Sequence, residues 1–388
     1  MTSSYYQRRE CRICNSDNLR LVLPLVPTPS GDKYLTESQR SIPQEPVPLD
    51  LYQCAVCGLV QLPYVIHPDA LYGDYIYETS ISLGLTKHFR GYAEEVAGNL
   101  RLDRGDLVVD IGSNDGTLLG HFRDLGLQVL GVEPSPASAK AQHLGIDTKV
   151  GYFGEVLSRD IRNAVGPAMA ITANNVFANI DNLDDVLKSF LPETIFHEHL
   201  SYFSLGSLMV LFERHGMQVF DATRVATKGG SLRGFVQLTE AGRPVSNRVA
   251  QLLAIEHALG TSNPGVFSAF SATLAATKHR LSILLEELRG SGKSIVGYGA
   301  SVGVTTLLYQ FDIAGFLDYL VDDNTAKHFR FSPGSQLPVL PSDVLYERKP
   351  DYALILAWAY ADPIIARHRH FLDGGGHFVI PLPDLTVI

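Results

Sequence analysis

Short apolar runs alternate with helix-like spacings of apolar residues along the chain, and this alternation predicts an α/β fold with parallel strands. Val108–Ile111, Leu127–Val132 and Ala168–Val176 have the composition of parallel strands covered on both faces, the last of them ending in polar residues. A helix is expected at Lys87–Asn99, before the first strand. We therefore expect a parallel sheet in the first half of the chain.

The second half continues the alternation and adds a long helical region. Gly290-Ser291-Gly292 precedes a new strand-turn-strand unit that ends in Asp322-Asp323-Asn324. That unit is either a second nucleotide-type crevice or a Rossmann-like packing domain, and the residues alone favour neither. The elements expected after residue 180 are helices at Asn182–Phe190, Leu205–Gly216 and within Gly242–Arg289, and strands at Gln218–Val225, Ser231–Thr239, Ser294–Tyr298 and Leu317–Val321.

The turn after the first strand, IGSNDGTLL, has the features of a cofactor site. Gly112 and Gly116 permit positive φ angles and a close approach of the backbone to a ligand. Their Gly-x-x-x-Gly spacing differs from that of a dinucleotide site, while Glu133, about 20 residues downstream at the end of the next strand, can accept both hydroxyls of a ribose. An adenosine without a pyrophosphate is favoured over an ordinary strand-turn-helix with chance glycines. The residues expected to hold the cofactor are Asp110, Gly112, Asn114, Asp115, Gly116, Glu133, Pro134 and Asn174.

Composition and charge exclude several classes of protein. The 388 residues, 45% of them hydrophobic, predict two or three compact domains. A formal net charge of -9 without a basic stripe argues against a nucleic-acid surface. The sequence shows no apolar stretch long enough for a membrane span and no apolar core of a signal peptide at its start. We therefore expect a cytoplasmic monomer or homodimer with no nucleic-acid or membrane partner.

All four cysteines lie near the start of the chain, in two Cys-x-x-Cys knuckles formed by Cys11 with Cys14 and by Cys54 with Cys57. Two such knuckles match a tetrahedral thiolate site for Zn2+. Two disulfides and a redox Cys-x-x-Cys are the weaker alternatives in a cytoplasmic chain without a thioredoxin-like pattern. With four protein ligands, the metal is expected to hold together a small lobe of Pro-rich loops and to take no part in chemistry.

His197-Glu198-His199 is a second candidate site. Histidines at i and i+2 of an extended segment point to opposite faces, and the spacing is not the His-Glu-x-x-His of zinc proteases, so a metal site is disfavoured. One histidine acting as a general base beside a carboxylate is the better account. The alternative is a polar surface loop, but flanking aromatic residues, among them Phe196 and Tyr202, suggest a pocket wall.

Two family resemblances rest on these motifs. IGSNDGTLL resembles motif I of class I S-adenosylmethionine-dependent methyltransferases. The order of the zinc cysteines, a Tyr-x-Tyr connector, IGSNDGTLL, HEHLSYFS, GGSLR and a terminal GYGA is similar to that of the sugar C-methyltransferases that act on nucleotide-linked 4-keto-deoxysugars, over nearly the whole chain. The resemblance implies a Rossmann-like class I methyltransferase domain, a small N-terminal zinc-binding lobe and a C-terminal Rossmann-like α/β domain, working in natural-product deoxysugar biosynthesis.

The resemblance also implies a mechanism and roles for residues. In that family a base removes the proton at C3 of the sugar, beside the C4 ketone, and the enolate attacks the methyl group of S-adenosylmethionine. His199 is implied as the base, with Glu198 supporting it and Tyr75 or Tyr77 closing over the substrate near the enolate oxygen. The residues implied in substrate binding are His197, Tyr202, Lys228, Arg233, Tyr298, Asp322 and Asp323.

Single residues depart from the family pattern. Phe196 stands where the family usually has tyrosine, and Lys228 and Asn179 stand where histidine is usual. Gly303 replaces a common lysine, which removes a cation that could meet a phosphate.

A larger departure follows Phe190. The family normally has a strand and a linker between this residue and Glu193, where the present chain has Leu191-Pro192. Loss of a central strand exposes the backbone groups of its neighbours, at a cost well beyond that of a single substitution. Either the following Glu-Thr-Ile-Phe segment pairs in its place, or the chain is a shortened member of the family.

We therefore expect C-methylation next to a ketone of a nucleotide-activated deoxysugar. The alternatives are methyl transfer to O, N or C of another acceptor, and a non-catalytic homologue that binds cofactor or nucleotide sugar. A dehydrogenase is disfavoured because Gly297-Tyr298-Gly299 lacks a third glycine before its helix. The expected domains are a zinc-binding lobe at 1–68, a methyltransferase domain at 69–240, a helical connector at 241–290 and a nucleotide-sugar-binding domain at 291–388.

Overall fold

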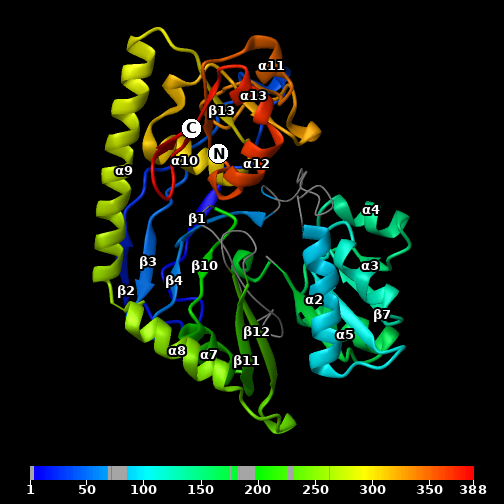
Figure 1. Cartoon of the computed structure of the whole chain (residues 1–388). Helices are drawn as coiled ribbons and strands as arrows, with labels where there is room; N and C mark the ends of the chain where they lie inside the picture. The colour runs from blue at the N-terminus through cyan, green and yellow to red at the C-terminus, as the bar shows by residue number, and fades with distance from the viewer. Residues whose placement is uncertain are drawn as a thin grey trace. The chain divides into compact units, whose positions relative to one another are not determined.

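The computed structural model describes residues 4–68, 71, 85–174, 176–181, 183, 197–225, 231–261 and 263–388. The chain divides into two compact units, whose helices and strands are labelled in Figure 1. Unit 1 holds Met1–Arg20, Gln53–Thr194 and Glu198–Ser262, and unit 2 holds Leu21–Tyr52, Ile195–His197 and Asn263–Ile388. The finer division into four domains stays a prediction.

A parallel four-stranded sheet forms the α/β part of unit 1. Its order is β8-β7-β6-β9, with β8 at Thr148–Lys149, β7 at Gln128–Val132, β6 at Leu107–Ile111 and β9 at Ala170–Ala173. All five residues of β6 are buried, because helices pack on both faces. One face carries α2 (Leu85–Leu100), α3 (Thr117–Asp124) and α4 (Ala137–His143), and the other carries α5 (Glu155–Val165). The predicted parallel sheet is confirmed.

The predicted strands near residues 217–239 form an antiparallel hairpin of β11 (Met217–Val225) and β12 (Ser231–Leu238). Among the described residues this hairpin does not pair with the parallel sheet, and β9 is that sheet's edge. A cavity of about 520 Å3 is lined by residues 168–174, along β9, and by all of β12. Residues 193–196, the segment that could pair with β9, lie outside the described ones, so the expected loss of a strand stays a prediction.

The cysteine knuckles belong to unit 1 and lie beside short strands. β3 (Leu51–Cys54) ends at the third cysteine, and β4 (Val60–Gln61) follows the fourth. β4 pairs with β10 (Ser201–Tyr202), which follows the His-Glu-His triplet, in a sheet of order β10-β4-β3-β2. The cysteines share a hydrophobic core with α7, α8 and β11. The remaining bounds are β1 Tyr5–Gln7, β2 Leu19–Leu23, β5 Tyr64–Ile66, α7 Leu205–Glu213 and α8 Asn247–Leu259.

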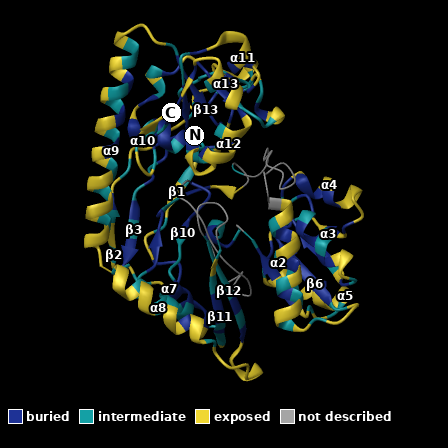
Figure 2. Ribbon diagram, in the orientation of Figure 1, coloured by how far each residue is buried: buried dark blue, intermediate teal, exposed yellow. Residues whose placement is uncertain are grey.

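Unit 2 contains the second predicted α/β part, a six-stranded sheet of order β15-β14-β13-β16-β17-β18 in which the last strand alone is antiparallel. The strands are β13 Ile295–Tyr298, β14 Leu320–Asp322, β15 Val339–Pro341, β16 Tyr352–Ile355, β17 His377–Ile380 and β18 Thr386–Val387. The helices are α9 Gly265–Gly290, α10 Val302–Phe311, α11 Val344–Arg348, α12 Ala361–Arg367 and α13 Arg369–Asp373. Figure 2 shows α9 exposed along most of its length, with Thr277, Leu281 and Leu285 as its buried positions.

Protein contacts within unit 2 hold the Pro-rich segment between the two knuckles. The hydroxyl of Thr305 donates to the carbonyl of Gly31 at 2.9 Å, and Leu35 exchanges both backbone hydrogen bonds with Phe331. Contacts with residues that are remote in sequence thus hold these loops in addition to the expected metal.

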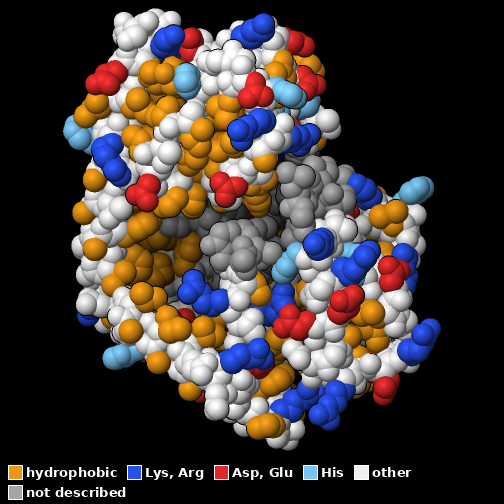
Figure 3. All heavy atoms as spheres, in the orientation of Figure 1, with side chains coloured by type: hydrophobic (Ala, Val, Ile, Leu, Met, Phe, Trp, Pro, Cys, Tyr) orange, Lys and Arg blue, Asp and Glu red, His pale blue; other side chains and the backbone are white. Residues whose placement is uncertain are grey.

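The surface carries charges of both signs. On the face drawn in Figure 3, basic and acidic side chains are interspersed, in keeping with a net charge of -9. Within the described part of the chain, no helix combines the length and apolarity needed to cross a bilayer.

Candidate active site and metal centre

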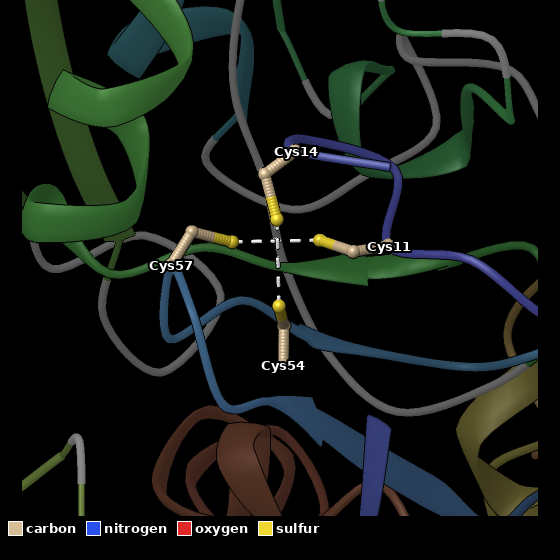
Figure 4. A group of neighbouring side chains, drawn as sticks. All are labelled: Cys11, Cys14, Cys54 and Cys57. Carbon is tan, nitrogen blue, oxygen red and sulfur yellow. Dashed lines mark hydrogen bonds between the residues drawn. The ribbon is translucent and has the colours of Figure 1, made fainter. Parts of the chain in front are cut away.

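The four cysteine side chains of unit 1 point toward one another (Figure 4). Their Sγ atoms all lie within 4.8 Å of one another, with 3.4 Å between Cys11 and Cys57 and 3.5 Å between Cys14 and Cys54. A tetrahedral Zn2+ site with bonds of about 2.3 Å has S···S edges of about 3.8 Å, so the four sulfurs need little adjustment to bind one ion. All four cysteines are free, which contradicts the disulfide alternative.

The thiol pKa values fit a cluster that needs a cation. The hydrogen bond with Cys57 lowers the pKa of Cys11 to about 5, whereas burial, aided by the bond with Cys54, raises the pKa of Cys14 to about 11. Neighbouring thiolates repel one another, so a divalent cation lets all four lose their protons. Four sulfur ligands complete a tetrahedral shell and leave no position for a substrate. The cluster therefore fits a structural zinc.

The turn between β6 and α3 has the conformation that its glycines predict. The φ angles are +67° at Gly112, +49° at Asn114 and +78° at Gly116. A Cβ on Gly112 would lie 2.8 Å from Cγ2 of Val176, and one on Gly116 would lie 3.1 Å from Cβ of Ala141. Both glycines are therefore required by the backbone and by packing inside the protein, before any ligand is considered.

Glu133 joins this turn to the end of β7. One carboxylate oxygen accepts the N–H of Asn114 at 2.9 Å, and the other accepts the N–H of Ser135 at 2.8 Å. The residue is 6% exposed. A carboxylate has about four acceptor positions, so two amide bonds leave room for the two hydroxyls of a ribose. The geometry of Glu133 therefore fits the predicted role.

Asp110 is a second buried acid at the end of β6. Its Oδ1 accepts the hydroxyl of Thr172 at 2.6 Å. Burial raises the pKa of Asp110 to about 7, and the charge of Glu133 adds to the rise, while hydrogen bonds from Thr172 and Asn174 oppose it. Asn174 also lies beside the half-buried Tyr92 of α2 and lowers the pKa of its hydroxyl, which burial raises. Near pH 7 this carboxyl is therefore balanced between its charged and neutral forms.

Two other predicted cofactor residues have local roles in the structure. Oδ1 of the buried Asp115 accepts the N–H of Thr117 at 3.1 Å and its hydroxyl at 2.6 Å, which satisfies the first turn of α3 as a capping residue does. Pro134 is half-buried beside Glu133. Their contacts with a cofactor stay predictions.

The His-Glu-His triplet is buried, which contradicts the surface-loop alternative. His197, Glu198 and His199 are 1%, 5% and 5% exposed. In unit 2, Nε2 of His197 lies 3.1 Å from the carbonyl oxygen of Val47, so this nitrogen carries the proton and donates it. Burial lowers the pKa of His197 to about 4, and the ring is neutral at pH 7. This leaves His199, in unit 1, as the candidate base.

The predicted substrate residues of unit 1 are held by protein contacts. Tyr202 lies in β10, paired with β4. Arg233 of β12 forms an ion pair with Glu95 of α2, and its guanidinium lies 4.4 Å from the ring centre of Tyr92. Arg233 therefore joins β12 to α2. Tyr75, Tyr77, Phe196 and Lys228 lie outside the described residues.

The predicted substrate residues of unit 2 lie at the turn between β13 and α10. Asp322 accepts the N–H of Ala300 at 2.6 Å and that of Asn324 at 2.7 Å. The hydroxyl of the buried Tyr298 donates to Asp323 at 3.0 Å and lies 2.8 Å from Nε2 of His368. The side chain of Tyr298 is therefore part of an internal polar network, and its role toward a substrate stays a prediction.

A buried cation at the same turn was missed at the sequence level. Nζ of Lys327 donates to the carbonyl of Ala300 at 2.7 Å and to Asp32 at 2.5 Å. It lies 4.6 Å from the ring centre of Tyr34. Lys327 thus brings an ammonium group to the turn although position 303 is glycine. No local signal marks this lysine, because its acidic partner is 295 residues away in sequence.

Comparisons with known proteins agree over the length of the chain. Residues 226–383 match a family described as "C-methyltransferase C-terminal domain", and residues 11–72 match one described as "Putative zinc binding domain". The C-methyltransferase NovU of Streptomyces niveus is 32% identical to this chain over 405 aligned positions, which cover 98% of the chain and 96% of NovU.

Similarity to solved structures is weak. A magnesium protoporphyrin IX methyltransferase from Synechocystis, with bound S-adenosylmethionine, has 14% identity and a TM-score of 0.30 over 40% of this chain and 79% of that one. A methyltransferase from Aquifex aeolicus has 13% identity and a TM-score of 0.28 over 39% of this chain and 98% of that one. Similarity at this level adds nothing to the full-length relationship with NovU.

Proposed function

The chain belongs to the C-methyltransferase family, and from that premise we propose that it methylates a carbon next to a ketone of a nucleotide-linked deoxysugar, C3 beside the C4 ketone, with S-adenosylmethionine as methyl donor. Family membership supports carbon as the atom that receives the methyl group. The sugar, a cytoplasmic location and a monomeric or homodimeric state are parts of the proposal.

The observation that supports S-adenosylmethionine as the cofactor is the position of Glu133 at the β6–α3 turn. Glu133 accepts two amide N–H groups and keeps acceptor positions for the hydroxyls of a ribose. Asp110 and Asn174 lie at the ends of the neighbouring strands β6 and β9. S-adenosylmethionine supplies an electrophilic methyl group on a positively charged sulfonium. Two carboxyl groups beside the turn favour a positively charged nucleoside over a phosphate.

His199 is proposed to remove the proton beside the ketone. A neutral imidazole nitrogen takes the proton, and the electrons of the C–H bond move onto the ketone oxygen to give an enolate. The α-carbon of the enolate would then form the new bond to the methyl group while the bond between that methyl group and the sulfonium sulfur breaks, with its electrons left on the sulfur of S-adenosylhomocysteine. At 5% exposure the ring of His199 is shielded from bulk water, and Glu198, the adjacent residue, would orient it or raise its basicity. Tyr75 or Tyr77 would handle the enolate oxygen.

The substrate contacts follow the family resemblance. Tyr298, Asp322 and Asp323 are proposed to contact the nucleotide sugar, together with His197, Tyr202, Lys228 and Arg233. Arg233, His197, Tyr298, Asp322 and Asp323 all have partners within the protein, so each would contact a substrate through its remaining donor or acceptor positions.

Labelled S-adenosylmethionine and a dTDP-4-keto-6-deoxysugar in D2O test the proposal. We expect the labelled methyl group on a carbon of the sugar and, when the methyl donor is withheld, exchange of the proton beside the ketone for deuterium. His199→Ala should reduce both by about 1,000-fold, because general-base catalysis contributes on that order, with cofactor affinity unchanged. Absence of methyl transfer by the wild-type protein would contradict the proposal, and transfer to O or N that survives in His199→Ala would support another acceptor.

A second candidate, a non-catalytic binding homologue, is favoured by one observation. β9 is the edge of its sheet in the described part of the chain and borders a cavity of about 520 Å3. Cofactor binding without deuterium exchange at the substrate carbon would support this candidate, and rapid exchange would exclude it.

A further inference from the structure

Arg12 lies inside the first cysteine knuckle, between two metal ligands, and its side chain is fully buried in unit 1. Its Nε donates to Oδ1 of Asp181 at 2.8 Å. One terminal nitrogen donates to two carbonyl oxygens, that of Leu62 at 2.7 Å and that of Leu200 at 3.0 Å. A single guanidinium therefore contacts three separate segments of the chain.

Leu200 directly follows His199, and its backbone is held on both sides. Its carbonyl oxygen also accepts the N–H of Leu62 at 3.0 Å, and its own N–H donates to the carbonyl of Ala178 at 2.7 Å. The next two residues pair with β4. The backbone that leaves His199 is therefore fixed by main-chain bonds, with Arg12 as its charged donor.

Stability alone is a poor reason for an arginine at this position. Burial raises the pKa of Asp181, but the charge of Arg12 and the contacts of Tyr6 and Arg8 outweigh it and hold the pKa of that carboxyl below its usual range. A buried ion pair of this kind often stabilises a protein no more than well-packed apolar side chains do. What apolar side chains cannot supply is a pair of directed hydrogen bonds to the carbonyls of residues 62 and 200.

We propose that Arg12 is a positioning residue for His199: it joins the metal knuckle to the backbone of Leu200 and so fixes the place of the imidazole ring. The inference rests on the proposed function, in which His199 is the base. The backbone of Arg12 is held as firmly as its guanidinium group, because metal ligands flank the residue and its backbone N–H donates to the side chain of Gln61 at 3.0 Å. The cysteine cluster then contributes to the reaction through the placement of a base.

Arg12→Lys in the zinc-loaded, full-length protein is the first test. Lysine keeps the charge, but its single nitrogen cannot reproduce the planar fork that reaches Asp181 and both carbonyls. We expect one zinc per chain and a cofactor Kd within about twofold of wild type, as the cysteines and Glu133 are untouched. Amide hydrogen exchange at residues 199–203 should rise about tenfold. Proton exchange at the substrate carbon should fall about 10- to 100-fold in kcat, with KM changed less than about threefold, because misplacing a catalytic group by about 1 Å has effects of that size.

Arg8→Gln is the matched control. Arg8 also binds Asp181, through its backbone oxygen at 3.0 Å and its carboxylate at 3.4 Å, and its described contacts do not include Leu200. We expect amide exchange at residues 199–203 and kcat within about twofold of wild type. If Arg12→Lys does not fold, Asp181→Asn takes its place. That variant keeps both bonds from Arg12 to the carbonyl oxygens and removes the negative charge that orients the guanidinium group. We then expect amide exchange at residues 199–203 to rise about threefold.

The outcomes separate the inference from the proposed function. Wild-type amide exchange and wild-type kcat in Arg12→Lys would overturn the inference, as would equal losses in Arg12→Lys and Arg8→Gln. If the wild-type protein itself shows no proton exchange at the substrate carbon, the proposed function fails. A selective rise in amide exchange at residues 199–203 in Arg12→Lys would then still support the positioning contact.

Discussion

Each unit of the molecule has a strand-to-helix turn that is joined to an acid on the neighbouring strand. In unit 1 Glu133, after β7, accepts the amide of Asn114, and in unit 2 Asp322, in β14, accepts the amide of Ala300. Each acid also accepts the N–H two residues further along its own chain. The arrangement therefore stabilises the turn in both units, whether or not a ligand binds there.

The two turns differ in the charges around the acid. In unit 1 a second acid, Asp110, lies beside Glu133 and is partly ionised near pH 7, and its side chain accepts the hydroxyl of Thr172. In unit 2 Lys327 lies against the carbonyl of Ala300 and is paired with Asp32. A strand-end acid is thus a weak predictor of function by itself. The charge beside it makes the turn of unit 1 the one suited to a positively charged nucleoside.

Removal of the metal should produce the largest difference in stability between the two units. Structural zinc contributes on the order of 10 kcal/mol, and all four ligands belong to unit 1, so Cys14→Ser or chelation should destabilise that unit. The single tryptophan, Trp358, lies in unit 2. We expect amide exchange at residues 4–20 and 53–68 to approach unfolded rates, while the denaturation midpoint from Trp358 fluorescence stays constant. If the denaturation midpoint at Trp358 fell as well, the two units would not respond to the metal separately.

Lys327→Met should have the next largest effect, confined to unit 2. It leaves the half-buried carboxylate of Asp32 without its ion-pair partner, which costs up to about 3 to 5 kcal/mol. The double variant Lys327→Met/Asp32→Asn should recover most of that loss. Guanidinium denaturation followed at Trp358 measures both variants. A double variant as unstable as the single one would contradict the pairing.

Acid should weaken unit 2 through His197 by a smaller amount. Its pKa is about 4 in the folded chain against 6.5 when unfolded, so the unfolded state binds the proton first and stability is lost as the pH falls from 6.5 to 4. The full loss is about 3 kcal/mol. His197→Gln keeps a donor for the carbonyl of Val47 and should remove this part of the pH dependence, measured as the free energy of unfolding at Trp358. Unchanged pH dependence in the variant would contradict the assignment.

The α/β parts could be predicted from the sequence because buried parallel strands are apolar on both faces. β6, β7 and β13 appear within one residue or two of their predicted positions. The packing of residues 21–52 in unit 2 could not be predicted, because Gly31 and Thr305 are 274 residues apart and no local pattern records their contact.

The candidate site also contains residues that the sequence could predict and residues that it could not. Cysteine spacing alone predicted the four-sulfur cluster, because the ligands of a knuckle are close in sequence. Arg12 and Lys327 carry no such signal, since their partners are backbone carbonyls and remote acids. His197 was expected to contact substrate, and its bond to Val47 became visible only in the folded chain.

The central claim is that the turn of unit 1, and not that of unit 2, holds S-adenosylmethionine. Calorimetric titration of S-adenosylmethionine into Glu133→Gln and its matched counterpart Asp322→Asn tests it most directly. We predict that Kd rises about 100-fold in Glu133→Gln, the effect of losing hydrogen bonds to a charged acceptor, and stays within about twofold of wild type in Asp322→Asn. A larger loss in Asp322→Asn, or wild-type affinity in Glu133→Gln, would contradict the account.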